Sequence, residues 1–107
     1  MSTTGYSRPS RSMLFVIHAL DRPGALPDRL AHLEAHRAFL TNAASHSVTI
    51  VMAGPLMDDG GLTMIGSLLL IEAPDRATVE QFNRADPLYA ANIWATVTIT
   101  RFNRRLG

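Results

Sequence analysis

Two residues far apart in the sequence have the types and the placement that could move a proton. Asp86 follows Val79 and Phe82 at helical spacing, so a carboxylate stands where the pattern expects an apolar core residue. His36 borders the apolar stripe of an earlier predicted helix and is the titratable partner that we expect nearest to Asp86. An imidazole whose tautomer is fixed by a carboxylate is a competent general acid or base near neutral pH. The pattern therefore predicts an acid–base pair.

A purely structural role for both residues stays open at this point. Asp86 precedes Pro87 and could cap the following turn, while His36 could be an ordinary residue at the edge of the core. His32 lies one helical turn before His36, but the arrangement H-E-x-x-H is missing and no third ligand follows. The sequence also has no phosphate-binding or dinucleotide-binding glycine motif. We expect neither a metal site nor a cofactor.

Four further residues are candidates for contacts with a small molecule near this pair. Ser67 could donate a hydrogen bond, and Arg29 lies on the same predicted helix as the histidine. Gly54 could let a ligand approach the backbone. Tyr89 could wall a small pocket, although an aromatic residue at this place could equally belong to the core or to an interface.

The elements that must position these side chains follow from the hydrophobic pattern. It predicts strands over 12–19, 47–53, 62–73 and 94–102, and helices over 25–44 and 75–86. The expected core stripe of the first helix is Leu26, Leu30, Leu33 and Leu40. The order β-α-β-β-α-β predicts an α+β, ferredoxin-like fold, in which a four-stranded antiparallel sheet carries both helices on one face.

The other face of this sheet should not stay bare. Met13–Ile17 and Leu68–Ile71 are apolar on both alternate sides, and a large exposed apolar patch usually marks an interface. We therefore expect a homodimer that packs through the open sheet face and forms an α+β barrel.

Composition narrows the class of protein. With 107 residues, 47% hydrophobic and 18% charged, the chain can form one packed domain, expected over 12–107 after a flexible N-terminal tail over 1–11. A net charge of +1 without a clustered basic face argues against nucleic-acid binding. The absence of cysteine excludes disulfides and thiolate chemistry. Neither a membrane span nor a secretory signal is recognisable, so we expect a cytoplasmic protein.

Several short segments occur in an order and spacing typical of a known family. They are Asp21-Arg22-Pro23-Gly24, Arg29 with His36, Ala53-Gly54-Pro55-Leu56, Ile65-Gly66-Ser67, Asp86-Pro87 with an aromatic residue two positions on, and a last strand ending in Phe102. With these segments the chain resembles the YciI-like (YCII-related) family, which is related to muconolactone-isomerase-like proteins.

The resemblance implies a ferredoxin-like dimer whose pocket holds His36 and Asp86 as an acid–base pair, with Ser67 nearby. One branch of the family removes chloride from chlorinated ring-cleavage products of aromatic degradation. Many members carry an arginine three residues before the helix histidine, where this chain has Leu33. A substrate carboxylate would therefore need a different partner, and the nearest basic residues are Arg29 and Arg37.

These observations favour an enzyme that uses His36 and Asp86 on a small organic molecule of the ring-cleavage type, by proton transfer or elimination. The alternative is a non-catalytic dimeric module that binds a small ligand or a partner, in which the two residues form a structural hydrogen bond. A monooxygenase-like activity has only the predicted fold in its favour, and a fold alone does not carry function.

Overall fold

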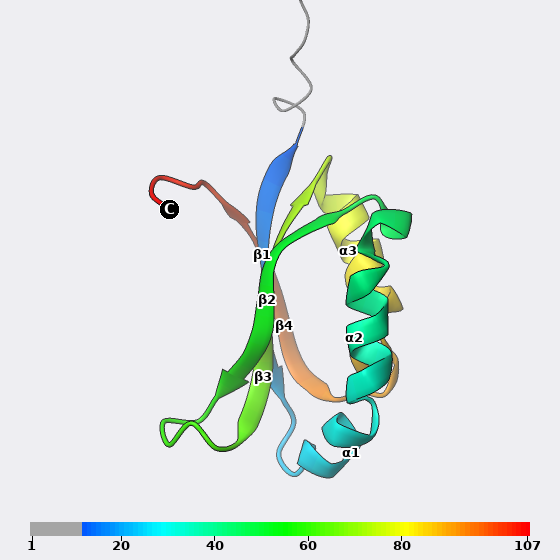
Figure 1. Ribbon diagram of the computed structural model, residues 1–107, viewed down its shortest axis with the longest axis vertical. Coiled ribbons are helices and arrows are strands. Elements are labelled where there is room, and N and C mark those ends of the chain that lie inside the picture. Colours follow the sequence, from blue (N-terminus) through cyan, green and yellow to red (C-terminus); the bar gives the residue numbers. More distant parts are fainter. Residues whose placement is uncertain (1–11) are drawn as a thin grey trace, which may run out of the picture.

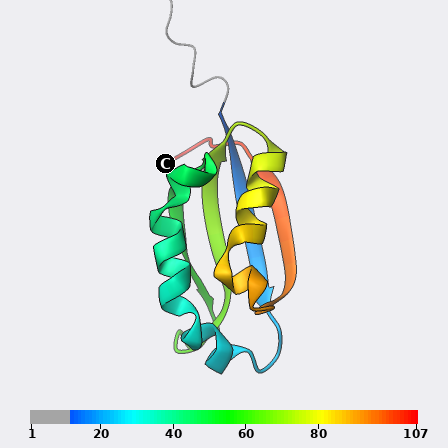
Figure 2. The same cartoon turned by 90° about the vertical axis from the view of Figure 1, so that its right-hand side faces the viewer.

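The computed structural model describes residues 12–107, so the tail expected over 1–11 lies outside the described residues. Its elements are β1 (Met13–Asp21), α1 (Leu26–Ala31), α2 (Leu33–Thr41), a 3-10 turn (Ala43–His46), β2 (Thr49–Met57), β3 (Met64–Ala73), α3 (Arg76–Ala85), α4 (Pro87–Ala90) and β4 (Trp94–Phe102). The strands form an antiparallel sheet in the order β2-β3-β1-β4, and the helices cover one of its faces (Figures 1 and 2). The predicted four-stranded α+β, ferredoxin-like fold is confirmed.

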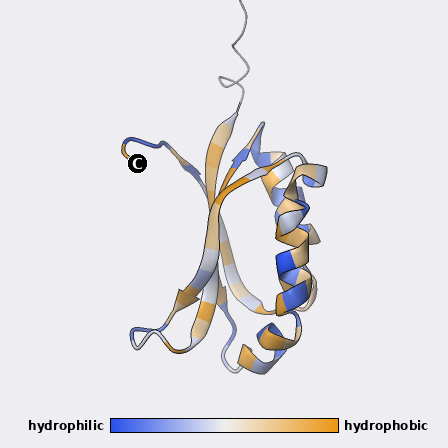
Figure 3. Ribbon diagram, in the orientation of Figure 1, coloured by the Kyte–Doolittle hydropathy of each residue, from blue (hydrophilic) through white to orange (hydrophobic). Residues whose placement is uncertain are grey.

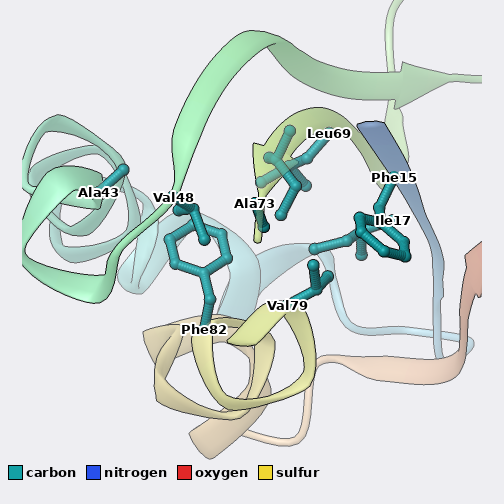
Figure 4. Close-up of a cluster of buried hydrophobic side chains, with 9 residues drawn as sticks. Phe15, Ile17, Ala43, Val48, Leu69, Ala73, Val79 and Phe82 are labelled. Carbon is teal, nitrogen blue, oxygen red and sulfur yellow. The ribbon is translucent and has the colours of Figure 1, made fainter. Parts of the chain in front are cut away.

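The main core lies between the sheet and the helices α2 and α3. Successive side chains of a strand point to opposite faces, so Phe15 and Ile17 of β1 face the helices together with their partners Ile71 and Leu69 on β3. Figure 4 shows Phe82 and Val79 of α3 directed into this cluster. Its buried members are Phe15, Ile17, Ala43, Val48, Leu69, Ile71, Ala73, Val79 and Phe82. Because complete burial of one large apolar side chain contributes about 1.5–3 kcal/mol, this cluster fixes α3 on the sheet and with it the position of Asp86.

The first predicted helix is wrong in one respect, because the segment 25–44 holds two helices. The break lies at His32, whose backbone is non-helical at φ −107° and ψ 5°. Nδ1 of His32 donates to the carbonyl oxygen of Asp28 at 2.8 Å, and such local side-chain bonds compete with the helical pattern. The break leaves Leu30 52% exposed, so the predicted core stripe is wrong at this residue. Arg29 is buried instead.

The second strand is longer at its end than the sequence predicts. β2 does not end at Ala53 but continues through Gly54 and Pro55 to Met57. Proline cannot donate to the sheet, but β2 is an edge strand, where a missing N–H group on the outer side costs little. Gly54 therefore lies inside a strand and not in a loop.

The face of the sheet opposite the helices is largely apolar. Val16, Leu68 and Leu70 point to this side and line a hollow of about 300 Å³ together with Met52 and Phe102. Figure 3 shows apolar stretches along the strands, and Figure 1 shows no helix on this face.

Of the helices in residues 12–107, none is long and apolar enough to cross a membrane.

Candidate active site

His36 and Asp86 meet in the structure although fifty residues separate them. His36 lies on α2, and Asp86 is the residue between α3 and α4. Nδ1 of His36 is 2.9 Å from Oδ1 of Asp86, and the two residues are 8% and 1% exposed. Because a carboxylate accepts hydrogen bonds, Nδ1 is the donor, which leaves Nε2 as the acceptor of the neutral ring.

The proline after Asp86 determines where its carboxylate lies. Pro87 disfavours helical backbone at the preceding residue, and Asp86 is extended at φ −66° and ψ 131°. This ends α3 and begins α4. Oδ1 of Asp86 also accepts the backbone N–H of Leu88 at 2.9 Å, which is the bond of a helix N-cap. The same oxygen therefore orients the imidazole and caps the short helix.

A cavity of about 180 Å³ opens beside His36. Three of the predicted contact residues, Arg29, Ser67 and Gly54, line it together with His36. Its apolar walls come from α2 and from the strands β2 and β3, and include Leu33, Leu40, Pro55 and Met64. Among residues 12–107 no group forms a hydrogen bond with Nε2 of His36. This nitrogen is the one through which His36 can act on a bound molecule.

The fourth predicted contact residue, Tyr89, is not at this cavity. Tyr89 is 44% exposed and lines a separate hollow of about 350 Å³ with Asn92 and Trp94. The two histidines His32 and His36 do not converge with further ligands either. Within residues 12–107 no three histidine or carboxylate side chains are placed to hold a metal ion.

The sequence did not predict the carboxylate that pairs with Arg29. Nε and Nη2 of Arg29 donate to Oδ2 and Oδ1 of Asp21 at 2.7 and 2.9 Å. Nη2 of Arg29 also donates to Oγ of Ser67 at 2.7 Å. Arg29 is only 1% exposed, and a buried guanidinium needs such a partner. The signal in the sequence was the acid at the end of the first strand, just before the Pro-Gly turn.

Ser67 owes its place to the residue before it. Gly66 lies opposite Leu20 of β1, and a Cβ atom at this position would overlap the carbonyl oxygen of Ala19. The missing side chain therefore lets β1 and β3 approach closely, as expected for a glycine inside a strand. Ser67 pairs with Ala19 in this register and points toward the helices. Since Oγ of Ser67 accepts from Arg29, its hydroxyl proton can be donated to a ligand.

The fold and the buried imidazole–carboxylate pair beside a small cavity define the class, that of small ferredoxin-like α+β proteins with a ligand-sized site under the helices. Within this class, the model of the YCII-related domain family matches residues 13–103, and the chain belongs to this family. Among curated proteins no relative was found.

Two solved structures illustrate the likeness. The 5-chloro-2-hydroxyhydroquinone dehydrochlorinase of Burkholderia phenoliruptrix AC1100, solved with 2,5-dihydroxybenzoquinone, is 32% identical, with a TM-score of 0.79 over 87% of this chain and 96% of that chain. A protein of Bacteriodes thetaiotaomicron VPI-5482 that is assigned to the antibiotic biosynthesis monooxygenases is 11% identical. Its TM-score is 0.57 over 91% of this chain and 92% of that chain. The second likeness shows the fold alone.

Proposed function

We propose that this protein is an enzyme in which His36, held by Asp86, transfers protons on a small hydroxylated ring compound and thereby removes chloride from it. The observation that carries the proposal is the bond of 2.9 Å between Nδ1 and Oδ1, formed at the wall of a cavity of about 180 Å³. The likeness to a dehydrochlorinase at 32% identity supports the choice of reaction.

The reaction can be written with the groups of this site. Nε2 of His36 takes the proton of a ring hydroxyl and returns it to the chlorine-bearing carbon, which gives a ketone with a saturated C–Cl carbon. A second hydroxyl then loses its proton to Nε2 while chloride leaves with the electron pair of the C–Cl bond. The net change is the loss of HCl from a chlorinated polyhydroxybenzene to give a quinone, so no external oxidant is required.

The neighbouring residues support this proton transfer. Asp86 keeps the proton on Nδ1 and balances the positive charge that His36 acquires, as the third group of a hydrolytic triad does. The Ser67 hydroxyl, held by Arg29 at 2.7 Å, can donate to a ring oxygen on which negative charge develops. Both groups are fixed by buried partners and need little reorganisation during the reaction.

The test is the release of chloride from 5-chloro-2-hydroxyhydroquinone, measured with a chloride electrode alongside the absorbance of the quinone. Loss of a positioned general acid–base costs about 100- to 10,000-fold in rate, and we expect His36→Gln to show a loss of this size in kcat. Asp86→Asn should also lower kcat, because an amide can donate to Nδ1 and stabilise the wrong tautomer.

The matched control is His32→Gln, which changes a histidine four residues earlier that does not line the cavity. This variant should release chloride at the wild-type rate. A His36→Gln variant that turns over as fast as the wild type would overturn the proposed role of the pair. A wild type that releases no chloride would overturn the proposed reaction.

A second function has one observation in its favour, namely the N-cap bond between Asp86 and Leu88. In this alternative the protein is a non-catalytic ligand-binding module, and the His36–Asp86 bond ties α2 to the α3–α4 junction. It predicts that Asp86→Ala lowers the melting temperature in a protein that binds ring compounds without converting them. The chloride assay separates it from the enzyme.

We further propose that two copies of the chain associate through the open sheet face. The hollow lined by Val16, Leu68 and Leu70 is apolar, and an exposed patch of this kind usually marks an interface. A second identical sheet presents the same surface, and a two-fold arrangement would cover both at once.

A further inference from the structure

The charges around the cavity beside His36 are unevenly balanced. Arg29 is matched by Asp21 in a two-bond ion pair, and His36 is matched by Asp86. Arg37 also lines the cavity, yet its side chain is exposed and no carboxylate of residues 12–107 lies within ion-pair distance of it. The cavity lining contains no Asp or Glu. A bound anion would therefore contact one guanidinium that has no counter-charge from the protein. It would meet no carboxylate that repels it.

Arg37 both lines the cavity and is exposed, so this residue lies where the cavity meets solvent. Successive residues of a helix are turned by about 100°, so Arg37 lies beside the buried His36 but further toward the surface. Leu33 precedes Arg37 by four residues and shares its side of α2, where it forms an apolar wall. A long arginine side chain can lay its methylenes along such a wall and keep its charged end at the opening.

The size of the cavity fits one ring. An apolar cavity of about 150 Å³ is known to hold benzene, and this one measures about 180 Å³. A guanidinium binds oxyanions through two parallel N–H bonds, which fixes orientation as well as position. An oxyanion on the ring, either a carboxylate or an ionised acidic hydroxyl, would lie at the mouth while the rest of the ring reaches His36.

We propose that Arg37 is the specificity-determining residue of this site. Its guanidinium binds the oxyanion of a ring-shaped substrate at the cavity mouth and orients the ring toward His36. This inference rests on the proposed function, since it names the class of substrate for the same site. It assigns Arg29 to the interior network with Asp21 and Ser67, and Arg37 alone to the anion.

The test measures binding by titration calorimetry with three probes of similar size. One is 2,5-dihydroxybenzoquinone, whose hydroxyls are acidic because each is conjugated to a carbonyl group. Benzoate supplies a carboxylate, and hydroquinone is uncharged at neutral pH. A hydrogen bond to a charged group corresponds to about 10- to 100-fold in affinity, so Arg37→Gln should weaken both anions by this factor and leave hydroquinone unchanged. Arg37→Lys should recover part of the loss, because it restores charge without the two-bond geometry.

The matched control is Arg84→Gln, an exposed arginine in the last turn of α3 that does not line the cavity. It should bind all three probes like the wild type. If Arg37→Gln weakens the binding of only one anion, the inference is upheld, and that anion is the oxyanion source that the site selects. An Arg37→Gln variant with wild-type affinity for both anions, an equal loss for hydroquinone, or a wild type that binds neither anion would overturn it. If the wild type binds the anions but releases no chloride, the proposed reaction fails while the role of Arg37 stands.

Discussion

At the residue scale, Gly66 is the glycine of residues 12–107 at which an added side chain would find the least room. A Cβ atom there would meet the carbonyl oxygen of Ala19, and the Leu56 side chain lies 3.1 Å away on the other strand. The carbonyl belongs to the ladder between β1 and β3 and cannot move without shifting a strand. The close approach of these strands also sets the position of Ser67 opposite Ala19.

We expect Gly66→Ala to lower the free energy of unfolding by about 1–3 kcal/mol, the usual cost of overpacking a tight site. Urea denaturation with the wild type as reference measures the difference. Gly54→Ala is the control, because nothing lies within 4 Å of a Cβ atom at that position and the residue is also in a strand. Equal stability losses in the two variants would show that the contact with Ala19 is not the cause.

The contact between His36 and Asp86 could be predicted from the sequence, whereas its surroundings could be predicted only in part. Asp86 stood out because the helical period placed a carboxylate in a buried position, and this signal is local. The pairing of Arg29 with Asp21 depends on how α1 turns after the Pro-Gly loop, and no periodicity reports that turn. The closeness of Tyr89 to Asp86 in sequence predicts that it lies at the cavity, but Tyr89 belongs to α4 and lines a separate hollow.

At the element scale, the sequence predicts two boundaries wrongly, one inside the first helix and one at the end of β2. A single helical phase from 25 to 44 predicts Leu30 in the core, but the break at His32 shifts the phase of α1. Gly54-Pro55 is a strong turn signal, but an edge strand tolerates both residues. The first error arises from a local bond between His32 and Asp28 that hydrophobic periodicity does not report, and the second from the position of β2 at the edge of the sheet.

The start of α3 gives a pH-dependent prediction. Asp75 is the N-cap, and its side chain accepts from both the hydroxyl and the backbone N–H of Thr78, which lowers the pKa of Asp75 below the ordinary 3.8. The unfolded chain then binds a proton more readily than the folded one, so this stabilisation is complete above pH 3.8 and is lost as the pH falls through the folded pKa.

Asp75→Asn should keep the cap, since asparagine caps helices about as well as aspartate, but remove the titration. Melting temperatures measured from pH 7 to pH 2.5 should therefore fall less steeply for the variant than for the wild type. Some acid sensitivity will remain, because backbone N–H groups of Thr63 and Leu62 lower the pKa of Asp58 in the hairpin. Parallel curves for the two proteins would contradict a contribution of the lowered pKa of Asp75 to the acid sensitivity.

At the scale of the whole molecule, the sheet has one face covered by helices and one face bare. The sequence predicted this asymmetry, because β1 and β3 are apolar on both sides while the chain supplies helices for only one. Two copies that pack their bare faces together would leave both cavities beside His36 on the outer, helical layers. Association would then stabilise the strands that carry Ser67 without closing the site.

Leu68→Glu should separate the proposed dimer, because it places a charge in the middle of the bare face opposite His18 and Gly54. Sedimentation equilibrium should report two chains for the wild type and one for this variant. Leu30→Glu is the control, since Leu30 is equally apolar but 52% exposed on α1, on the helical side. A wild type that sediments as one chain at all concentrations would refute the dimer.

The two hydrogen bonds of the Asp86 carboxylate affect how the sequence of this protein can change during evolution. Because one oxygen holds both His36 and the Leu88 amide, replacing Asp86 removes a helix cap together with the proposed proton-transfer pair. Selection for a folded protein therefore protects Asp86 even in a lineage that does not need the proposed activity. His36 lacks this second protection. In relatives that lack the proposed activity, the histidine should be replaced first, while the aspartate should be retained.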